Sequence, residues 1–169
     1  MRNSELRDFM DMNRSSVASS LQFVTFMLGT ELYGIDILKV EEIVGMSRIN
    51  PVPDCPPWMK GVINMRGKVI PVIDMRVRFR MAAVDYTGMT VILVVSFREK
   101  SLGLIVDSVS DVNSIDLDLV QDSPHFGSDV ETAVIRGICP VDGAPVVLLD
   151  LDKLLSVEDM ALIEAGTVV

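Results

Sequence analysis

The chain contains an internal repeat, and this repeat limits the folds that it can adopt. The stretch GVINMRGKVIPVIDM at 61–75 aligns with GICPVDGAPVVLLDL at 137–151. Two glycines and an aspartate match at a spacing of 76 residues (61 and 137, 67 and 143, 74 and 150). A second match, at a spacing of 69 residues, pairs a glycine and a valine of 33–44 with those of 102–113 (34 and 103, 40 and 109). The chain therefore consists of two related halves whose loops differ in length.

Each half contains short runs rich in Val, Ile and Phe that are separated by turn residues, a pattern typical of strands. In the first half we expect strands at 21–28, 31–37, 42–49, 61–66 and 68–73. In the second half we expect strands at 90–98, 101–107, 109–115, 134–141 and 144–149. Short strands repeated in this way predict an all-β fold of two small five-stranded barrels rather than a helical or βαβ fold.

The same pattern predicts the domain boundaries. Residues 1–20 are polar and lack the apolar core of a secretory signal, so we expect a flexible N-terminal tail. The first barrel should then comprise 21–88 and the second barrel 89–149. Residues 150–169 should form a C-terminal helical segment that packs on a barrel.

Two segments outside the strands have clear local signals. The prolines of PDCPPWMK at 53–60 are not tolerated in a central strand and predict a loop or a single helical turn. In SVEDMALIEAG at 156–166, Ser156 and Asp159 are typical of a helix start, and Gly166 is typical of a helix end.

The charged residues are unevenly distributed within a net charge of -9. Residues 21–88 carry eight basic and seven acidic residues, whereas 89–169 carry four basic and fourteen acidic residues. Because phosphate binding draws on an excess of basic residues, nucleic acid is disfavoured as a partner. A local basic stretch does occur, and most such clusters are simply solvated. Its members are Lys60, Arg66, Lys68, Arg76, Arg78 and Arg80. A single-stranded nucleic acid binder would need several stacking aromatics on that face, and only Trp58 stands beside it.

The sequence shows little catalytic chemistry. Its single histidine, His125, lies in the polar segment DSPHFGSD, which is typical of a surface loop. A nucleophile–base couple of Cys55 and His125 remains the alternative, a small enzyme, although nothing local marks Cys55 as activated. Cys139 takes the place of Ile63 in the repeat, which predicts a core residue. No phosphate-binding loop or metal-ligand cluster stands out, so we predict no cofactor or metal, and the two cysteines fit a reducing cytoplasm.

Arg66 stands at the tip of a hairpin whose strands are otherwise apolar. It is either a solvated turn cation or a residue that serves something other than folding. The repeat places Asp142 at the same position, so the turn itself does not require a cation. Arg66→Asp, which copies the repeat, should therefore leave folding intact.

The stretches YGIDILKVEEI at 33–43, GVINMRGKVIPVIDMR at 61–76, GLIVDSVSDV at 103–112 and LLDLDKLL at 148–155 carry a likeness to a known family. Together they resemble the CheW-type coupling (adaptor) proteins of bacterial chemotaxis, from about residue 21 to 165. The resemblance implies a non-catalytic adaptor or scaffold made of two SH3-like β-barrels. It implies two partners, the regulatory domain of a CheA-type histidine kinase and the signalling tips of methyl-accepting chemoreceptors. It also implies a cytoplasmic protein that is recruited to membrane-associated receptor arrays.

The resemblance further implies where the receptor binds. In this family a helical hairpin of the receptor is thought to lie in a groove between the two barrels. The corresponding positions here are Ile37, Val40, Glu42, Arg66, Val91, Gly103 and Val109. Glu42 and Arg66 match a polar pair beside the groove, and the others match apolar groove positions. Each valine, taken alone, could equally be an ordinary core residue.

A second surface is implied where barrels of the adaptor and of the kinase regulatory domain pack end to end into rings. Phe126 matches an aromatic position of that contact, and the neighbouring Gln121 stands where some relatives carry a basic residue. We also hypothesise that the basic stretch of the first half and the acidic second half suit a head-to-tail contact between unlike ends.

Overall fold

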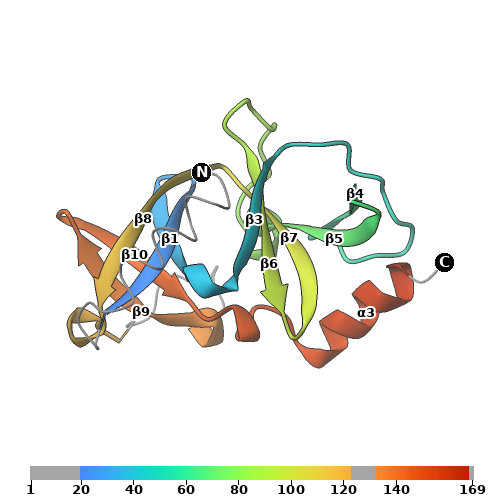
Figure 1. Cartoon of the computed structure of the whole chain (residues 1–169). Helices are drawn as coiled ribbons and strands as arrows, with labels where there is room; N and C mark the ends of the chain where they lie inside the picture. Colours follow the sequence, from blue (N-terminus) through green and yellow to red (C-terminus); the bar gives the residue numbers. More distant parts are fainter. Residues whose placement is uncertain (1–19, 123–131, 168–169) are drawn as a thin grey trace.

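The computed structural model describes residues 20–122 and 132–167 and shows a mostly β fold with a short C-terminal helix (Figure 1). Its strands are β1 (Ser20–Leu28), β2 (Glu31–Asp36), β3 (Val40–Gly45), β4 (Met59–Met65), β5 (Lys68–Asp74), β6 (Val91–Phe97), β7 (Lys100–Val106), β8 (Ser108–Asp116), β9 (Ile135–Val141) and β10 (Ala144–Leu149). All the predicted strands are confirmed. The largest difference is at β3, which ends at Gly45 rather than at 49, because the chain leaves the sheet there toward Asn50.

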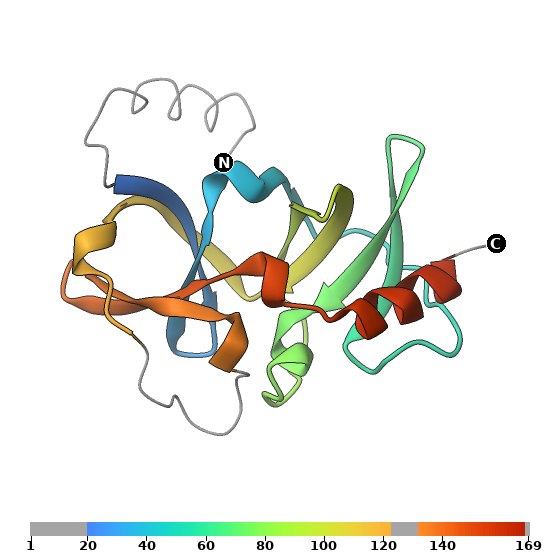
Figure 2. The ribbon, with the colours of Figure 1, turned by 90° about the horizontal axis from the view of Figure 1, so that it is seen from below.

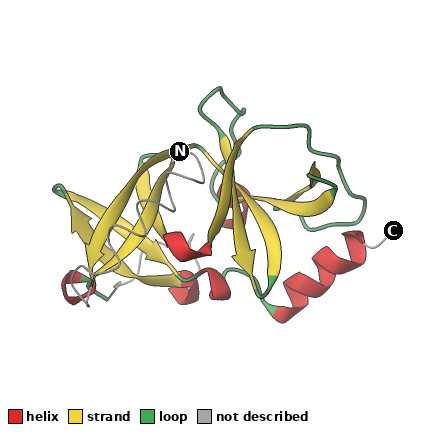
Figure 3. Ribbon diagram, viewed as in Figure 1, coloured by secondary structure: helices red, strands yellow, loops and turns green. Residues whose placement is uncertain are grey.

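Short helical turns separate the strands (Figure 3). They are η1 (Ile37–Lys39), α2 (Met75–Arg78), η2 (Leu117–Leu119), η3 (Thr132–Val134) and η4 (Leu151–Lys153), and the longer helix is α3 (Val157–Thr167). Four of these turns begin after an aspartate whose carboxylate accepts a hydrogen bond from a backbone N–H of the turn, at Asp36, Asp74, Asp116 and Asp150. Among residues 20–122 and 132–167, no helix has the length and apolar character needed to cross a membrane.

The strands form two five-stranded sheets, and each sheet is closed into a barrel. Barrel A has the order β8-β1-β2-β10-β9, and barrel B has the order β3-β6-β7-β5-β4. Asn50 forms an antiparallel bridge to β4 and closes barrel B, and Gln121 forms the equivalent bridge to β9 and closes barrel A. Both bridges need a glycine opposite, because a Cβ on Gly61 would lie 2.1 Å from the Asn50 oxygen and a Cβ on Gly137 would lie 2.9 Å from the Gln121 oxygen. The two small barrels predicted from the repeat are therefore present.

The assignment of strands to the barrels differs from the prediction of barrels at 21–88 and 89–149. The hairpin β1–β2 joins β8, β9 and β10, and the hairpin β6–β7 joins β3, β4 and β5. Each repeat thus contributes its first hairpin to the barrel that contains the last three strands of the other repeat. The predicted boundary at residue 88 does not describe the barrels, because parallel contacts of β2 with β10 and of β5 with β7 join strands that are distant in sequence.

The exchange of hairpins is symmetrical. Gly34 of β2 pairs with Leu148 of β10, and Gly103 of β7 pairs with Val72 of β5. These are the same repeat positions, since 34 matches 103 and 72 matches 148 at the spacings found in the sequence. The repeat is therefore a structural repeat, and its two copies are interleaved.

One hydrophobic core spans both barrels. It contains Phe26 and Tyr33 of barrel A together with Leu93 and Phe79 of the barrel B half. The rings of Phe26 and Tyr33 stack at 5.9 Å, and those of Tyr33 and Phe79 pack at 5.7 Å. A smaller apolar cluster fills the interior of each barrel. Because the central core is shared, the two barrels form one folded unit.

The chain leaves β10 of barrel A and ends in α3, which packs on barrel B (Figure 2). Ser156 and Asp159 form the predicted capping box, each backbone N–H donating to the other's side-chain oxygen at 3.0 Å. The helix runs to Thr167, one residue beyond the predicted end at 166. Arg78 donates to the Leu154 carbonyl at 2.8 Å, which helps to hold this segment against barrel B.

Candidate partner-binding surface

Arg66 lies at the tip of the β4–β5 hairpin in a left-handed backbone conformation, with φ 55°. Gly67 follows with φ 81°, so both central residues of the turn have positive φ, as a type I′ hairpin turn requires. The β9–β10 hairpin has the same turn, with φ 49° at Asp142 and 81° at Gly143. An aspartate adopts this conformation more readily than an arginine, because its short side chain bonds locally to the backbone. Arg66 therefore has an unfavourable backbone conformation, whereas the matching position of the other repeat has Asp142, which suits that conformation.

Glu42 holds the guanidinium group of Arg66. Nη2 of Arg66 donates to Oε1 of Glu42 at 2.9 Å. The Glu42 side chain is 18% exposed, whereas that of Arg66 is 74% exposed. The register of β3 against β6 shifts between Val40 and Glu42, and such bulges redirect side chains at barrel rims. The pair thus presents an exposed cation on a largely buried carboxylate, and the structure confirms that these two predicted residues lie together.

A second polar chain lies beside this pair. Nζ of Lys68 donates to Oγ of Ser101 at 2.8 Å, and the Ser101 hydroxyl donates to Oε2 of Glu41 at 2.8 Å. Ser101 is only 6% exposed. The two adjacent carboxylates, Glu41 and Glu42, therefore each meet a basic residue of the β4–β5 hairpin, one through Ser101 and one directly. The sequence offered no signal for this second chain, because its members come from three separate strands.

Several predicted groove residues lie where the chain crosses between the barrels. Ile37 opens η1, which connects β2 of barrel A to β3 of barrel B, and Val109 lies in β8 just after the crossing from β7. Ile37 is buried, and Val40, Val91 and Val109 are half-buried against the shared core. These side chains form the edge of the core, so both interpretations of the valines stay open.

Val40 and Val91 lie along the β3–β6 pair of barrel B, whereas Val109 lies in β8 of barrel A. Val40 pairs with Val95 near the Arg66 end, and Val91 pairs with Gly45 at the other end. The two ends are four residue steps apart along β6, from Val91 to Val95, which is roughly 13 Å at the usual rise. This length matches about two turns of an α-helix.

Gly103 is placed differently from a groove residue. It is buried in the centre of β7, and a Cβ there would lie 2.9 Å from Cγ2 of Ile92 and 3.3 Å from Cγ2 of Val72, inside barrel B. Gly34 has equally close neighbours at the matching position of barrel A. Packing within the barrels therefore explains this glycine, and the structure does not bring its side-chain position to the surface.

The predicted kinase contact lies mostly outside the described residues. Phe126 falls in 123–131, as does His125 of the enzyme alternative. Gln121 is exposed, and its backbone N–H and carbonyl bond to Ile138 at 2.8 and 2.9 Å. Its backbone thus completes barrel A, while its side chain faces solvent.

Cys55 lies beside backbone carbonyl groups, and Cys139 lies in the core. The Cys55 thiol lies 3.1 Å from the Val52 carbonyl oxygen and 3.3 Å from that of Met59, so it can donate to either. Cys139 is 2% exposed, which confirms its assignment to the core. Burial, with a smaller contribution from the charge of Asp116, raises the pKa of the Cys139 thiol and keeps it protonated.

The basic stretch is largely occupied within the molecule. Besides Arg66 and Lys68, Arg76 forms a two-pronged ion pair with Asp107. Arg78 donates to a carbonyl, and its guanidinium lies 5.9 Å from the centroid of the Trp58 ring. Arg66 and Lys68 are exposed, as a solvated face requires, whereas the side chains of Arg76 and Arg78 are only 16% and 11% exposed and do not belong to such a face. Sequence reasoning missed the Arg76–Asp107 pair because nothing local links residues so far apart.

A cavity of about 300 Å³ lies between α3, β5 and the β6–β7 hairpin. Its lining includes Val69, Phe97, Leu102, Met160 and Ile163. Among the described residues, none of the predicted site residues lines it, but Lys68 and Ser101 of the second polar chain do. The cavity therefore adjoins the surface that carries Arg66 and Glu42 without including either residue.

Comparisons with known proteins agree with this architecture. A profile described as CheW-like domain matches residues 22–159. The chain is 40% identical over 143 residues to the chemotaxis protein CheW of Klebsiella aerogenes, covering 85% of this chain and 86% of that protein. It is 36% identical over 135 residues to the probable chemotaxis protein CheW of Rhizobium etli, covering 80% and 87%. The crystal structure of the scaffolding protein TtCheW from Thermoanaerobacter tengcongensis superposes with a TM-score of 0.77 at 33% identity, covering 86% of this chain and 94% of that one. With a profile match over most of its length and these relatives, the chain belongs to the CheW-like family.

Proposed function

We propose that this chain is a non-catalytic adaptor that couples the cytoplasmic tips of chemoreceptors to a CheA-type histidine kinase in chemotaxis signalling arrays. Its relatives are named chemotaxis proteins, and its structural neighbour is titled a scaffolding protein. On this proposal the protein works in the cytoplasm and joins membrane-associated arrays through its partners.

The proposal of a receptor contact rests on the backbone conformation and exposure of Arg66. A non-glycine residue with φ near 55° is held at some cost, and such positions cluster at binding sites. Glu42 orients the guanidinium, and within the described residues it is the acceptor that Arg66 meets. A guanidinium has five N–H donors, so the exposed side keeps donors that fit a carbonyl or carboxylate of a partner.

The apolar part of the contact would be the row of Val40 and Val91 along the β3–β6 pair, together with Val109 of barrel A. A helix laid along this row would bury an apolar stripe, and Arg66 and Glu42 at one end would fix its orientation. Gly103 would contribute by letting β7 pack closely inside barrel B rather than by touching the partner.

For the kinase contact, the charge asymmetry found in the sequence persists after the exchange of hairpins, without becoming larger. Residues 37–107, which contain barrel B, carry ten basic and seven acidic residues. The segments of barrel A, 20–36, 108–122 and 132–150, carry one basic and eight acidic residues. Unlike ends of this kind suit head-to-tail contact, with Gln121 and Phe126 at the ring surface. If raising the salt concentration to roughly 0.5 M leaves kinase binding unchanged, charge does not drive this contact.

The test is a binding assay with two purified pieces, a receptor signalling fragment and the kinase regulatory domain, offered separately and together. Arg66→Asn keeps a residue that tolerates the turn and should lower affinity for the receptor fragment at least about tenfold, the effect of losing one oriented charge contact. Asp142→Asn, at the matching turn of barrel A, is the control and should bind as the parent does. Binding of the kinase domain should be unchanged in both. A parent protein that binds neither piece would refute the proposal.

A further inference from the structure

In the described part of the chain, two strand-to-strand connections cross between the barrels, and one of them is a single residue long. β7 of barrel B ends at Val106, and β8 of barrel A begins at Ser108. Asp107 is therefore the whole connection at this point. Its backbone N–H donates to the Met27 carbonyl of β1 at 3.1 Å, so barrel A already holds the main chain here.

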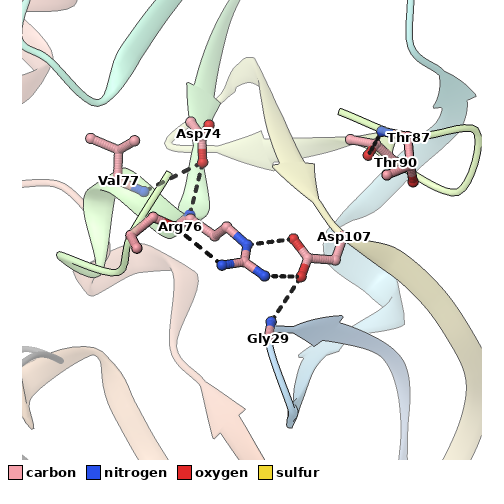
Figure 4. Close-up of polar contacts among 8 residues, drawn as sticks. Gly29, Asp74, Arg76, Val77, Thr87, Thr90 and Asp107 are labelled. Carbon is pink, nitrogen blue, oxygen red and sulfur yellow. Dashed lines mark hydrogen bonds and ion pairs between the residues drawn. The ribbon is translucent and has the colours of Figure 1, made fainter. Parts of the chain in front are cut away.

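The side chain of Asp107 links both barrels. Nε of Arg76 donates to Oδ1 at 2.8 Å, and Nη2 of Arg76 donates to Oδ2 at 2.6 Å, as Figure 4 shows. The same Oδ2 accepts the backbone N–H of Gly29 at 2.8 Å, in the turn between β1 and β2 of barrel A. Arg76 belongs to α2, which follows β5 of barrel B. One carboxylate thus fastens α2 of barrel B to the crossing strand and to a turn of barrel A.

Arg76 is itself held in place. Its side chain is 16% exposed, and Nη1 donates to the Ala82 carbonyl at 3.1 Å. Its backbone N–H donates at 2.9 Å to the buried carboxylate of Asp74, which also accepts the Tyr86 hydroxyl at 3.0 Å. The Arg76 guanidinium that binds Asp107 is therefore held in position by hydrogen bonds at its own backbone and side chain.

The repeat shows that the fold does not demand this pair. At the repeat spacings, Arg76 corresponds to Asp152 and Asp107 corresponds to Leu38, and Leu38 is 68% exposed. The nearest ion pair at that second crossing joins Lys39 to Asp152 at 3.7 Å, with both side chains about half exposed at 42% and 55%. One crossing thus has a largely buried two-pronged ion pair, here called the clamp, and the unclamped crossing has only an exposed pair, although both carry the chain between the barrels.

We infer that Arg76 and Asp107 are positioning residues that fix the angle between the barrels at one side, and so align the two halves of the receptor surface. The alignment part rests on the proposed function, because Val109 follows the clamp in barrel A while Val40, Val91 and Arg66 belong to barrel B. The hydrogen bonds from Arg76 lower the pKa of Asp107, which keeps the carboxylate charged at neutral pH. The rival explanation is that the shared core alone fixes the angle.

The first test needs no partner. Spin labels on Lys60→Cys in barrel B and Ser114→Cys in barrel A, both exposed positions, report the distance between the barrels once Cys55 and Cys139 are replaced by Ser and Val. Asp107→Asn and Arg76→Leu should shift the distance or at least double the width of its distribution. Arg76→Lys, which keeps the charge but not the fork, should lie between them and the parent. Lys39→Met, at the unclamped crossing, is the matched control and should leave the distribution unchanged.

The second test measures binding to the receptor fragment and to the kinase regulatory domain. Asp107→Asn should weaken receptor binding by about tenfold through misalignment and leave kinase binding unchanged. An unchanged distance distribution in Asp107→Asn and Arg76→Leu would overturn the inference, and so would loss of folded protein in Asp107→Asn, since the pair would then serve the fold. A changed distance with unchanged receptor affinity would overturn the alignment part. A changed distance in a protein whose parent binds no receptor would support the clamp and refute the proposed function instead.

Discussion

Substitutions at the turn position shared by the two repeats should separate the cost of Arg66 to folding from its use in binding. Arg66 and Asp142 occupy the same turn position with φ 55° and 49°. An ordinary residue in this left-handed region costs about 1 kcal/mol or somewhat more, and Asn or Asp largely avoids that cost. Arg66→Asn should therefore recover about 1 kcal/mol of backbone strain.

The same change removes the ion pair with Glu42. Because the Arg66 side chain is 74% exposed, water screens this pair, and pairs of this kind contribute about 0.2 to 1 kcal/mol. The two effects nearly cancel, so the free energy of unfolding should change by less than about 1 kcal/mol. The reciprocal change, Asp142→Arg, adds the same strain, and Asp111, which stands at the repeat position of Glu42, offers it a carboxylate on a shorter side chain, so the change should cost at most about 1 kcal/mol.

Urea unfolding followed by the fluorescence of Trp58 provides the measurement. Trp58 is the single tryptophan of the chain and packs against the shared core, so it reports on both barrels. The slope of the free energy against urea should be the same in all variants, which would show that only stability has changed. A loss of more than about 2 kcal/mol in Arg66→Asn would mean that Arg66 supports the fold, and the reasoning from strain would fail.

Three further outcomes follow from single groups. Hydrogen bonds from Arg76 lower the folded-state pKa of Asp107, so its contribution to stability is present above the unfolded pKa of about 4 and is lost as the pH falls below it. The destabilisation of Asp107→Asn in thermal melts should therefore shrink between pH 5 and pH 2, and a constant difference would contradict this. Burial and the charge of Asp74 raise the pKa of Tyr86, so stability should fall above about pH 10, where the unfolded chain ionises first, and Tyr86→Phe should flatten that loss. Gly103→Ala places a Cβ 2.9 Å from an isoleucine methyl and should cost about 1 to 3 kcal/mol in urea unfolding; a neutral result would show that barrel B has spare room.

The strands could be predicted from the sequence because their signals are local. Alternating apolar residues and turn glycines such as Gly67 and Gly143 depend on a few neighbours, and the repeat doubled each observation. The assignment of hairpins to barrels could not be predicted in this way. A hairpin such as β1–β2 has the same apolar pattern in either barrel. Its barrel is determined by parallel strand contacts between residues far apart in the sequence, such as Gly34 and Leu148.

Some residues of the candidate site could be named from the sequence, and others could be found only in the structure. Glu42 and Arg66 could be named from family resemblance, and the structure brings them within hydrogen-bond distance. The resemblance also named Gly103, whose neighbours in the structure are the interior of barrel B. The chain of Lys68, Ser101 and Glu41 could not be predicted, because each of these residues is unremarkable in its own strand and gains its partner only when the barrel closes.

Part of the charge asymmetry between the sequence halves is cancelled by ion pairs within the molecule. Arg76 and Arg78 were counted with the basic half, and Asp107 and Asp159 with the acidic half, yet these residues lie opposite one another within one molecule at 2.6 and 3.8 Å. Charges neutralised inside the molecule are not available to attract a neighbour. The surplus that remains is the carboxylate surface of barrel A, where residues 108–122 alone carry four acidic and no basic residues. If salt weakens the contacts between molecules, it should therefore act through barrel A, and neutralising acidic residues there should reduce the salt dependence more than changing the basic stretch does.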